Sequence, residues 1–454
     1  MILKYLRQSV ITLLGAILMS SCLGSESVDY DASKDAQIYS FSLSSKTDTS
    51  LYLSDTKFSI DQLNGKIFNR DSLPYLFNVD SVLLEISGKT TSSFTNVVLA
   101  LKDKDSTFIW NGKDSISFHR LSSIETTAED QNTKMTYQIS INIHQQDPYI
   151  ITWNQIAGNY LQPPVEQQKT ISYNGNFITY YYSNGILKAA VSASDSAAEW
   201  EPAVVAGLPN NISLSSFVSL PDAEGIMLFV LGDDGDVYSS SDGLAWSNVN
   251  FEYPVIAIYG AMSTTSGDMV ILAAADVDSD MYFITTRDFT AYNKKNVVGE
   301  DMPVENFSSI GFSKPSIYGG NYIALFGGSS MSGDTNKEVW ILKEESNNIN
   351  VIHQEPETAS GKPIDVITAS LFYYDKKVYM LVYDGYENIL YNSDYGINWS
   401  SGGENQVVPE GFALRKNSTV LTDADDYIWI FGGKSGRDIE LVDVWRGRLN
   451  KLAK

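Results

Sequence analysis

Residues 322–328 read YIALFGG, and residues 427–433 read YIWIFGG. Each stretch is followed at the same offset by a Val-Trp pair, Val339-Trp340 in the first case and Val444-Trp445 in the second. A continuous apolar run indicates a strand that is buried on both faces, and paired glycines permit left-handed backbone where such a strand ends. Two copies with one spacing indicate a repeated β-sheet unit, so repetition decides the fold.

Apolar runs of the same kind recur along the chain after residue 148, and aromatic residues mark their period. Trp200, Trp246 and Tyr292 follow one another at intervals of 46 residues. We interpret the runs as inner strands that neighbouring sheets cover on both faces. The four runs besides the two double-glycine copies are residues 177–182, 226–231, 269–274 and 378–382. Six units predict a six-bladed β-propeller over residues 149–454, in a protein of the all-β class.

The last unit, which contains Trp445, lacks an outer strand of its own. Residues 151–154, ITWN, stand one period before Trp200. We predict that this early segment forms the missing outer strand of the sixth blade, beside Trp445. Such a pairing would fasten the two ends of the propeller together and remove two exposed sheet edges.

The two double-glycine copies resemble degenerate Kelch repeats. This resemblance implies structural roles for the paired glycines and for the tryptophan that follows them. The residues concerned are Gly327, Gly328, Trp340, Gly432, Gly433 and Trp445.

Residues 392–399, NSDYGINW, resemble an Asp-box, and residues 241–246, SDGLAW, are one residue short of that motif. Residues 195–200 depart further, because Ala197 stands in place of the glycine. The resemblance implies that the carboxylate of Asp394 bonds backbone amides of its own hairpin. It also implies that three tryptophans pack between sheets, namely Trp399, Trp246 and Trp200.

Residues 37–148 read as a β-sandwich (Ig-like) domain. Residues 137–143 alternate apolar and polar side chains, which indicates a strand with one buried face and one wet face. Residues 82–86 and 97–101 are further apolar runs of strand length.

Residues 1–21 predict an export signal, in which Lys4 and Arg7 precede an apolar stretch too short to remain as a stable membrane anchor. Cys22 is the only cysteine, and with residues 19–21, Met-Ser-Ser, before it the segment resembles a lipobox. The resemblance implies a diacylglycerol on the Cys22 thiol and a contact with the membrane through this lipid. An ordinary secreted protein and a retained anchor are the alternatives.

Acidic residues dominate both the segment after the signal and the chain as a whole. Residues 22–36 resemble the acidic stretch that directs some lipoproteins to the outer face of the outer membrane, and a solvated linker is the alternative. The formal net charge of −23 repels phosphate backbones, so we expect no nucleic-acid partner.

The whole layout resembles a family of uncharacterised Bacteroidales-type lipoproteins. These combine an N-terminal sandwich-like domain of unknown function with a C-terminal propeller. The segment that carries the resemblance is residues 58–69, FSIDQLNGKIFN, leading into residues 71–75, DSLPY. The resemblance covers most of the chain and implies no activity.

The sequence shows no recognised catalytic set. The only thiol is assigned to the lipid, and no histidine stands in a nucleophile-elbow sequence. The three histidines are His119, His144 and His353. We expect no cofactor and no catalytic residue.

Alternating aspartates offer one weak calcium candidate, because converging carboxylates can hold a hard cation. Hairpin turns between apolar strands are the favoured interpretation, since Asp and Gly are the usual turn residues. The candidate ligands are Asp276, Asp278 and Asp280.

Three functions compete. The favoured one is a membrane-anchored module that binds a glycan or an envelope protein through propeller loops. Residues 180–182, three tyrosines, could stack on sugars, although core packing is the preferred interpretation. The alternative is a glycan-active hydrolase with a carboxylate pair in the central channel. The third is a structural component of the envelope.

Overall fold

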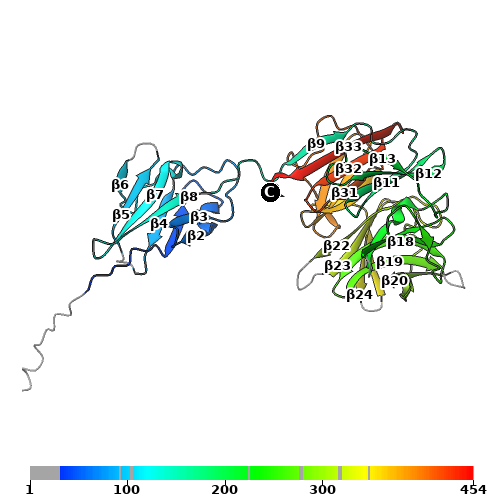
Figure 1. Ribbon diagram of the computed structural model, residues 1–454, viewed down its shortest axis with the longest axis horizontal. Coiled ribbons are helices and arrows are strands. Elements are labelled where there is room, and N and C mark those ends of the chain that lie inside the picture. The colour runs from blue at the N-terminus through cyan, green and yellow to red at the C-terminus, as the bar shows by residue number, and fades with distance from the viewer. Residues whose placement is uncertain are drawn as a thin grey trace, which may run out of the picture. The chain divides into compact units, whose positions relative to one another are not determined.

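The computed structural model describes residues 31–90, 94–102, 106–222, 225–275, 280–314, 320–345 and 348–452. It divides into two compact units, Met1–Asp147 and Pro148–Lys454 (Figure 1). Cys22 and the predicted export signal lie outside the described residues. Within the described part, none of the helices has the length and apolar character needed to cross a membrane.

The N-terminal unit is built from two sheets that share one core. A six-stranded sheet has the order β2-β3-β8-β7-β5-β6, and a two-stranded sheet pairs β1 with β4. The strands are β1 (Ser40–Ser44), β2 (Phe58–Asp61), β3 (Lys66–Asn69), β4 (Leu83–Ser87), β5 (Phe94–Leu101), β6 (Thr107–Ile109), β7 (Leu121–Ala128) and β8 (Lys134–Ser140), with short helical turns α2 (Tyr52–Asp55) and η2 (Phe118–Arg120).

This sandwich differs from the Ig-like arrangement that the sequence suggested. An immunoglobulin constant-type domain divides seven strands into sheets of four and three. Here the sheets have six and two strands among the described residues, and β3 runs parallel to β8. Leu43 and Leu84 of the small sheet pack into the same apolar cluster as Ile124 and Tyr137 of the large sheet. The two-layer core is therefore present with a different topology.

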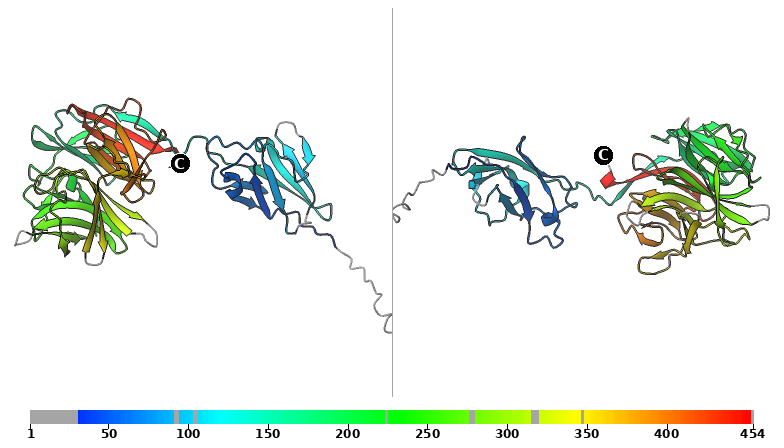
Figure 2. Two further views of the ribbon diagram at one scale, coloured as in Figure 1. Left: turned by 180° about the vertical axis from the view of Figure 1, so that it is seen from behind. Right: turned by 90° about the horizontal axis from the view of Figure 1, so that it is seen from below.

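Six antiparallel sheets, all within the described residues, form the blades of the C-terminal propeller (Figures 1 and 2). Blade 1 is β10 (Gln168–Tyr173), β11 (Asn176–Ser183), β12 (Ile186–Ala193) and β13 (Glu201–Ala203). Blade 2 is β14 (Val218–Asp222), β15 (Gly225–Leu231), β16 (Val237–Ser240) and β17 (Ser247–Asn248). Blade 3 is β18 (Val255–Thr264), β19 (Gly267–Ala275), β20 (Met281–Thr286) and β21 (Tyr292–Val297).

Blade 4 is β22 (Ser308–Lys314), β23 (Gly320–Phe326), β24 (Val339–Glu345) and β25 (Asn348–Gln354). Blade 5 is β27 (Thr368–Tyr374), β28 (Lys377–Tyr383), β29 (Asn388–Ser393) and β30 (Asn398–Ser401), with β26 (Glu357–Thr358) added in parallel at its edge. Blade 6 is β31 (Thr419–Thr422), β32 (Ile428–Lys434), β33 (Glu440–Leu449) and β9 (Ile151–Ala157). The predicted six-bladed propeller is confirmed.

The ring of blades is closed by the strand pairing that the sequence predicted. β9 pairs antiparallel with β33, so that Trp153 stands opposite Gly447 and Gln155 opposite Trp445. The first strand of the propeller unit is thus the outer strand of the last blade, and the expectation for residues 151–154 is confirmed. The indole nitrogen of Trp153 also donates to the Val407 carbonyl at 2.8 Å, which ties β9 to the loop after β30.

The six apolar runs are the second strands of their blades, counted from the channel. A second strand has a sheet neighbour on each side and a neighbouring blade on each face, so most of its side chains are buried and apolar. Phe177 of β11 illustrates this, because its ring lies 5.0 Å from that of Trp429 and 5.1 Å from that of Phe431 on blade 6.

The tyrosines of β11 belong to this packing. Tyr180 is fully buried, stacks on Phe217 and donates its hydroxyl proton to the Gly243 carbonyl. Tyr181 and Tyr182 are 7% and 9% exposed. These tyrosines are core residues, so the preferred core-packing interpretation of residues 180–182 is confirmed and the sugar-stacking alternative is wrong.

At Asp242 the carboxylate makes the backbone hydrogen bonds that the Asp-box resemblance implied. One oxygen of its carboxylate accepts the backbone amides of Leu244 at 2.7 Å and Ala245 at 2.8 Å. These two bonds hold the pKa of Asp242 below its usual range. Trp246 is buried between blades 1 and 2, with its ring 6.3 Å from that of Tyr180.

The closer sequence match, at Asp394, differs. Its side chain is largely exposed and forms an ion pair with Lys314, at 3.9 Å. Trp399 is nevertheless fully buried among blades 4 and 5. Trp200 is half-buried, and its ring lies 4.9 Å from that of Tyr160. The tryptophan positions therefore follow the blade period even where the carboxylate does not bond its hairpin.

A substitution at Gly447 tests the closure. A Cβ atom there would lie 2.3 Å from the Trp153 ring, so Gly447→Ala forces the indole out of place. Overpacking of this kind costs about 1–3 kcal/mol. We expect a lower midpoint in guanidinium denaturation followed by tryptophan fluorescence, because seven of the eight tryptophans lie in the propeller. Gly158→Ala, whose Cβ meets nothing within 4 Å, should leave the midpoint unchanged. An equal loss in both variants would contradict the closure.

Candidate functional site

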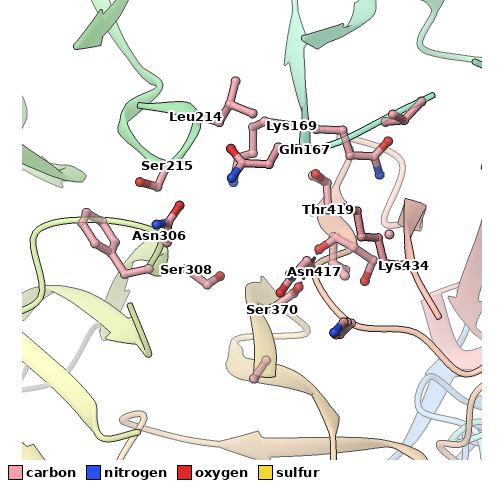
Figure 3. Close-up of a pocket in the computed structure, with 18 of the residues that line it drawn as sticks. Gln167, Lys169, Leu214, Ser215, Asn306, Ser308, Ser370, Asn417, Thr419 and Lys434 are labelled. Carbon is pink, nitrogen blue, oxygen red and sulfur yellow. Dashed lines mark hydrogen bonds between the residues drawn. The ribbon is translucent and has the colours of Figure 1, made fainter. Parts of the chain in front are cut away.

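A cavity of about 350 Å³ lies at one end of the central channel (Figure 3). We call it the channel-mouth pocket. Within the described residues, five of the six blades contribute to its wall. Polar side chains dominate that wall, and those labelled in Figure 3 are Gln167, Lys169, Ser215, Asn306, Ser308, Ser370, Asn417, Thr419 and Lys434.

The topology explains why these residues meet. In every blade the innermost strand begins at the same end of the channel, and antiparallel pairing returns the turn between the second and third strands to that end. The pocket is formed by the first residues of β10, β22, β27 and β31 and the segments that lead into them, together with the turn η3 (Leu214–Ser216) before β14.

The paired glycines that resemble those of Kelch repeats lie directly against segments that line this pocket. A Cβ atom on Gly433 would lie 2.7 Å from the Lys416 carbonyl oxygen, and one on Gly432 would lie 2.2 Å from the Gln168 side chain. Gly432 and Gly433 both have positive φ, 49° and 106°. These positions therefore require glycine for their backbone conformation and for the close approach of the segment before β31.

Blade 4 repeats this arrangement. Gly327 and Gly328 have φ of 71° and 87°, and a Cβ atom on Gly328 would lie 2.4 Å from the Glu305 carbonyl oxygen. The tryptophans after the glycines are both buried, and Trp445 donates to Asp443 at 2.7 Å while Trp340 donates to Asn336 at 3.1 Å. Both glycine pairs thus position a segment that enters an innermost strand.

Each of these two segments carries an asparagine with left-handed backbone. Asn306 has φ of 56° and Asn417 has φ of 55°, and both side chains are exposed to the pocket. Asparagine tolerates this conformation better than other non-glycine residues. Among the described residues, neither amide group has a hydrogen-bond partner in the protein. Both therefore present a free donor and a free acceptor to a ligand.

Hydroxyl groups join neighbouring blades around the pocket. Thr419 Oγ1 accepts the Thr170 amide at 3.3 Å, across the seam between blades 6 and 1. Ser308 Oγ accepts the Leu371 amide at 2.9 Å, and Ser370 donates to the Ser418 carbonyl at 2.6 Å. Hydrogen bonds therefore join neighbouring innermost strands at the end where these strands line the pocket.

The charged side chains of the wall are mostly engaged with one another. Lys416 and Asp438 form an ion pair at 2.8 Å, which holds the pKa of Asp438 below its usual range. Both carboxylate oxygens of Glu166 face the Gly185 amide, at 3.2 and 3.3 Å. Lys169 is half-buried, and desolvation by burial lowers the pKa of its ammonium group.

A buried ion pair anchors the segment that carries Asn417. Arg415, 1% exposed, donates to both carboxylate oxygens of Asp443, at 2.6 and 2.9 Å, and to the Gly432 carbonyl at 3.0 Å. Its guanidinium carbon lies 3.9 Å from the centre of the Phe412 ring. Burial raises the pKa of Asp443, but the bonds and charge of Arg415 outweigh this and hold it below the usual range.

The histidines lie apart from this pocket. His353 stacks on Trp340 with ring centres 4.1 Å apart and contacts Glu338 through Nδ1 at 2.7 Å, on the outer strand of blade 4. His119 is exposed in η2, and His144 follows β8 in the N-terminal unit. None of the three lines the channel-mouth pocket.

The calcium candidate is only partly described. Asp276 and Asp278 lie outside the described residues, and Asp280 contacts the Tyr282 hydroxyl at 3.4 Å. The other acidic turns have side chains that bond their own hairpins: Asp423, for example, accepts the Tyr427 amide at 2.9 Å and the Trp429 indole at 2.7 Å. Within the described part of the chain, no group of carboxylates is arranged to hold a metal ion.

Sequence reasoning missed the polar residues of the pocket, of which Lys169, Asn306 and Asn417 are the clearest. In two blades a sequence pattern could have indicated them, because an Asn-x-Ser/Thr tripeptide leads into the innermost strand. The two tripeptides are Asn306-Phe307-Ser308 and Asn417-Ser418-Thr419. No such tripeptide leads into the innermost strand of blade 1, which carries Lys169.

The ion pair of Arg415 can be tested by Asp443→Asn, which leaves the buried guanidinium without its counter-charge. We expect a loss of about 3 kcal/mol in the free energy of unfolding, measured by denaturant titration at pH 7. Because the pKa of Asp443 is lowered in the folded state, its contribution is present above the unfolded value near pH 4 and declines as pH falls. The difference between wild type and variant should therefore shrink in acid.

Asp438→Asn, in the same blade, removes an exposed partner of Lys416 and should leave the unfolding midpoint nearly unchanged. A large effect of Asp438→Asn, or none of Asp443→Asn, would contradict this assignment of the two pairs.

Two family models match the chain. Residues 31–141 match the DUF6242 N-terminal domain, described as a domain of unknown function, and residues 147–453 match the DUF6242 beta propeller domain. No curated protein matches the chain.

Two solved structures resemble the chain at low identity. The alpha-L-arabinofuranosidase Arb93A from Fusarium graminearum is 14% identical, with a TM-score of 0.42 over 67% of this chain and 99% of its own. The six-bladed fucose-binding lectin of Aleuria aurantia is 13% identical, with a TM-score of 0.37 over 62% and 93%.

Proposed function

Since the chain belongs to the DUF6242 family, a family of unknown function, we propose its function from the channel-mouth pocket: the protein is a binding module that holds a sugar unit of a glycan at the propeller axis. The observation that carries this proposal is a pocket lined by five blades, whose wall holds the unpartnered amides of Asn306 and Asn417 and hydroxyls from four of these blades. A sugar presents many hydroxyls, and each can donate to and accept from such groups.

The size and rigidity of the pocket support small-ligand binding. Its volume of about 350 Å³ is at the lower end of the range for ligand pockets. The hydrogen bonds between neighbouring innermost strands, such as Ser370 to Ser418, hold the wall in place before a ligand arrives. A preformed wall reduces the entropy that binding must overcome.

An exposed aromatic residue lies on blade 5, at the end of the propeller that holds the channel-mouth pocket. Tyr386, 87% exposed, occupies the turn between β28 and β29, which is at the pocket end of blade 5. The turn is rigid, because Asp384 accepts the amides of Tyr386 and Glu387, each at 2.7 Å. A sugar unit next to the bound one would stack its apolar face on this ring.

A glycan hydrolase would need a pair of carboxylates with different protonation states in this channel. The carboxylates of the pocket wall are Glu166 and Asp438. Asp438 pairs with Lys416, which favours its ionised form and makes it a poor proton donor. Glu166 is directed at the Gly185 amide. We therefore favour binding over hydrolysis.

The proposal also includes an envelope location, with Cys22 lipidated and the protein held on the outer membrane. Its support is the sequence alone. Metabolic labelling with an alkyne fatty acid should label the wild type, and Cys22→Ala should lose the label and leave the membrane fraction. Retention of label in Cys22→Ala would contradict the anchor.

Binding can be tested on an array of immobilised neutral and acidic oligosaccharides, followed by calorimetric titration of the best binder. The double variant Asn306→Gly/Asn417→Gly keeps the left-handed backbone and removes both amides. At about 0.5–1.5 kcal/mol for each lost hydrogen bond, affinity should fall about tenfold to a hundredfold.

Asn174→Gly is the matched control, because Asn174 has φ of 48° in the turn between β10 and β11, at the opposite end of the channel. Equal weakening by the control would contradict binding in the pocket. An array without any bound glycan would contradict the proposed function itself.

A further inference from the structure

We propose that the channel-mouth pocket selects an anionic sugar unit, one that carries a carboxylate or a sulfate, and that the ammonium group of Lys169 is its counter-charge. The inference rests on the proposed function, because it names the chemical class of the ligand for the same pocket.

The charges of the wall single out Lys169. Lys416 pairs with Asp438, and Lys434 adds to the positive charge around that same carboxylate. Glu166 accepts the Gly185 amide. Lys169, in contrast, has no carboxylate and no hydrogen-bond acceptor of the protein as a partner among the described residues. A protein with a net charge of −23 thus keeps an unpaired lysine in the wall of its channel mouth.

The backbone around Lys169 is firmly placed. Gln168 donates to the Phe431 carbonyl at 2.9 Å, and the hydroxyls of Thr170 and Thr179 are 2.8 Å apart. Between these anchored neighbours on β10, Lys169 projects into the pocket from the blade 1 side (Figure 3). The side chains of Ser215 and Asn306 line the same cavity. An anionic group beside Lys169 would therefore be surrounded by neutral donors that suit the hydroxyls of the same sugar.

The position of this lysine weakens the fold. Removing an ammonium group from water is unfavourable unless a counter-charge or acceptors replace the water. The wall of the channel lowers the pKa of Lys169 through burial, and no favourable charge in the protein offsets it. A destabilising polar group inside a cavity is typical of a binding site, where the ligand supplies the missing partner.

The experiment uses the full mature chain on an array in which neutral glycans stand beside their uronate-bearing and sulfated counterparts. We expect acidic members to bind at least about tenfold more strongly than their neutral counterparts. Lys169→Met should remove this preference while leaving the melting temperature unchanged or higher. Lys169→Arg should retain part of the preference, because the charge remains.

Lys188→Met is the matched control. Lys188 lies on β12 of the same blade, donates to Ser183 at 3.2 Å and does not line the pocket, so its loss should leave the preference unchanged. Equal binding of neutral and acidic members would overturn the inference while the proposed function stood. No bound glycan at all would overturn both. The uronate and sulfate arms identify which anion is selected.

Discussion

The pairing of β9 with β33 is the constraint on which the rest of the propeller depends. Without it, blade 6 would end on an open edge and blade 1 would have no fixed neighbour. Closure brings Gln168 of blade 1 against the Phe431 carbonyl and the Thr170 amide against Thr419. The seam between the first and last blades is also one wall of the channel-mouth pocket, so the site exists only in the closed ring.

Packing inside the ring follows from where each strand lies. Second strands such as β32 are covered on every side and are continuously apolar, whereas the innermost strands face the channel and carry serine and threonine. The paired glycines allow the segment before an innermost strand to approach its own blade closely, and the Arg415–Asp443 pair holds one such segment in place. Features that stabilise the blades therefore also position Asn417 and its neighbours.

The pocket has a rigid wall, and some of its polar side chains have no hydrogen-bond or ion-pair partner in the described part of the protein. Asn306 and Asn417 adopt left-handed backbone, which costs a non-glycine residue some conformational energy, and Lys169 is partly desolvated without a counter-charge. A wholly structural channel would gain stability from apolar or paired residues at these positions. The unmet donors and the unpaired lysine are instead the basis of the binding proposed for this mouth.

Local pattern in the sequence determined the number of blades, the position of the closing strand and the places of Trp246 and Trp399, because apolar runs and aromatic spacing report burial within one unit. It also favoured core packing for Tyr180, which the structure confirms. Only the tertiary structure brought together Lys169, Asn306 and Asn417. The innermost strands β10 and β31 are short and carry polar residues without a periodic signal, and the residues of the pocket meet only because the sheets are arranged around one axis.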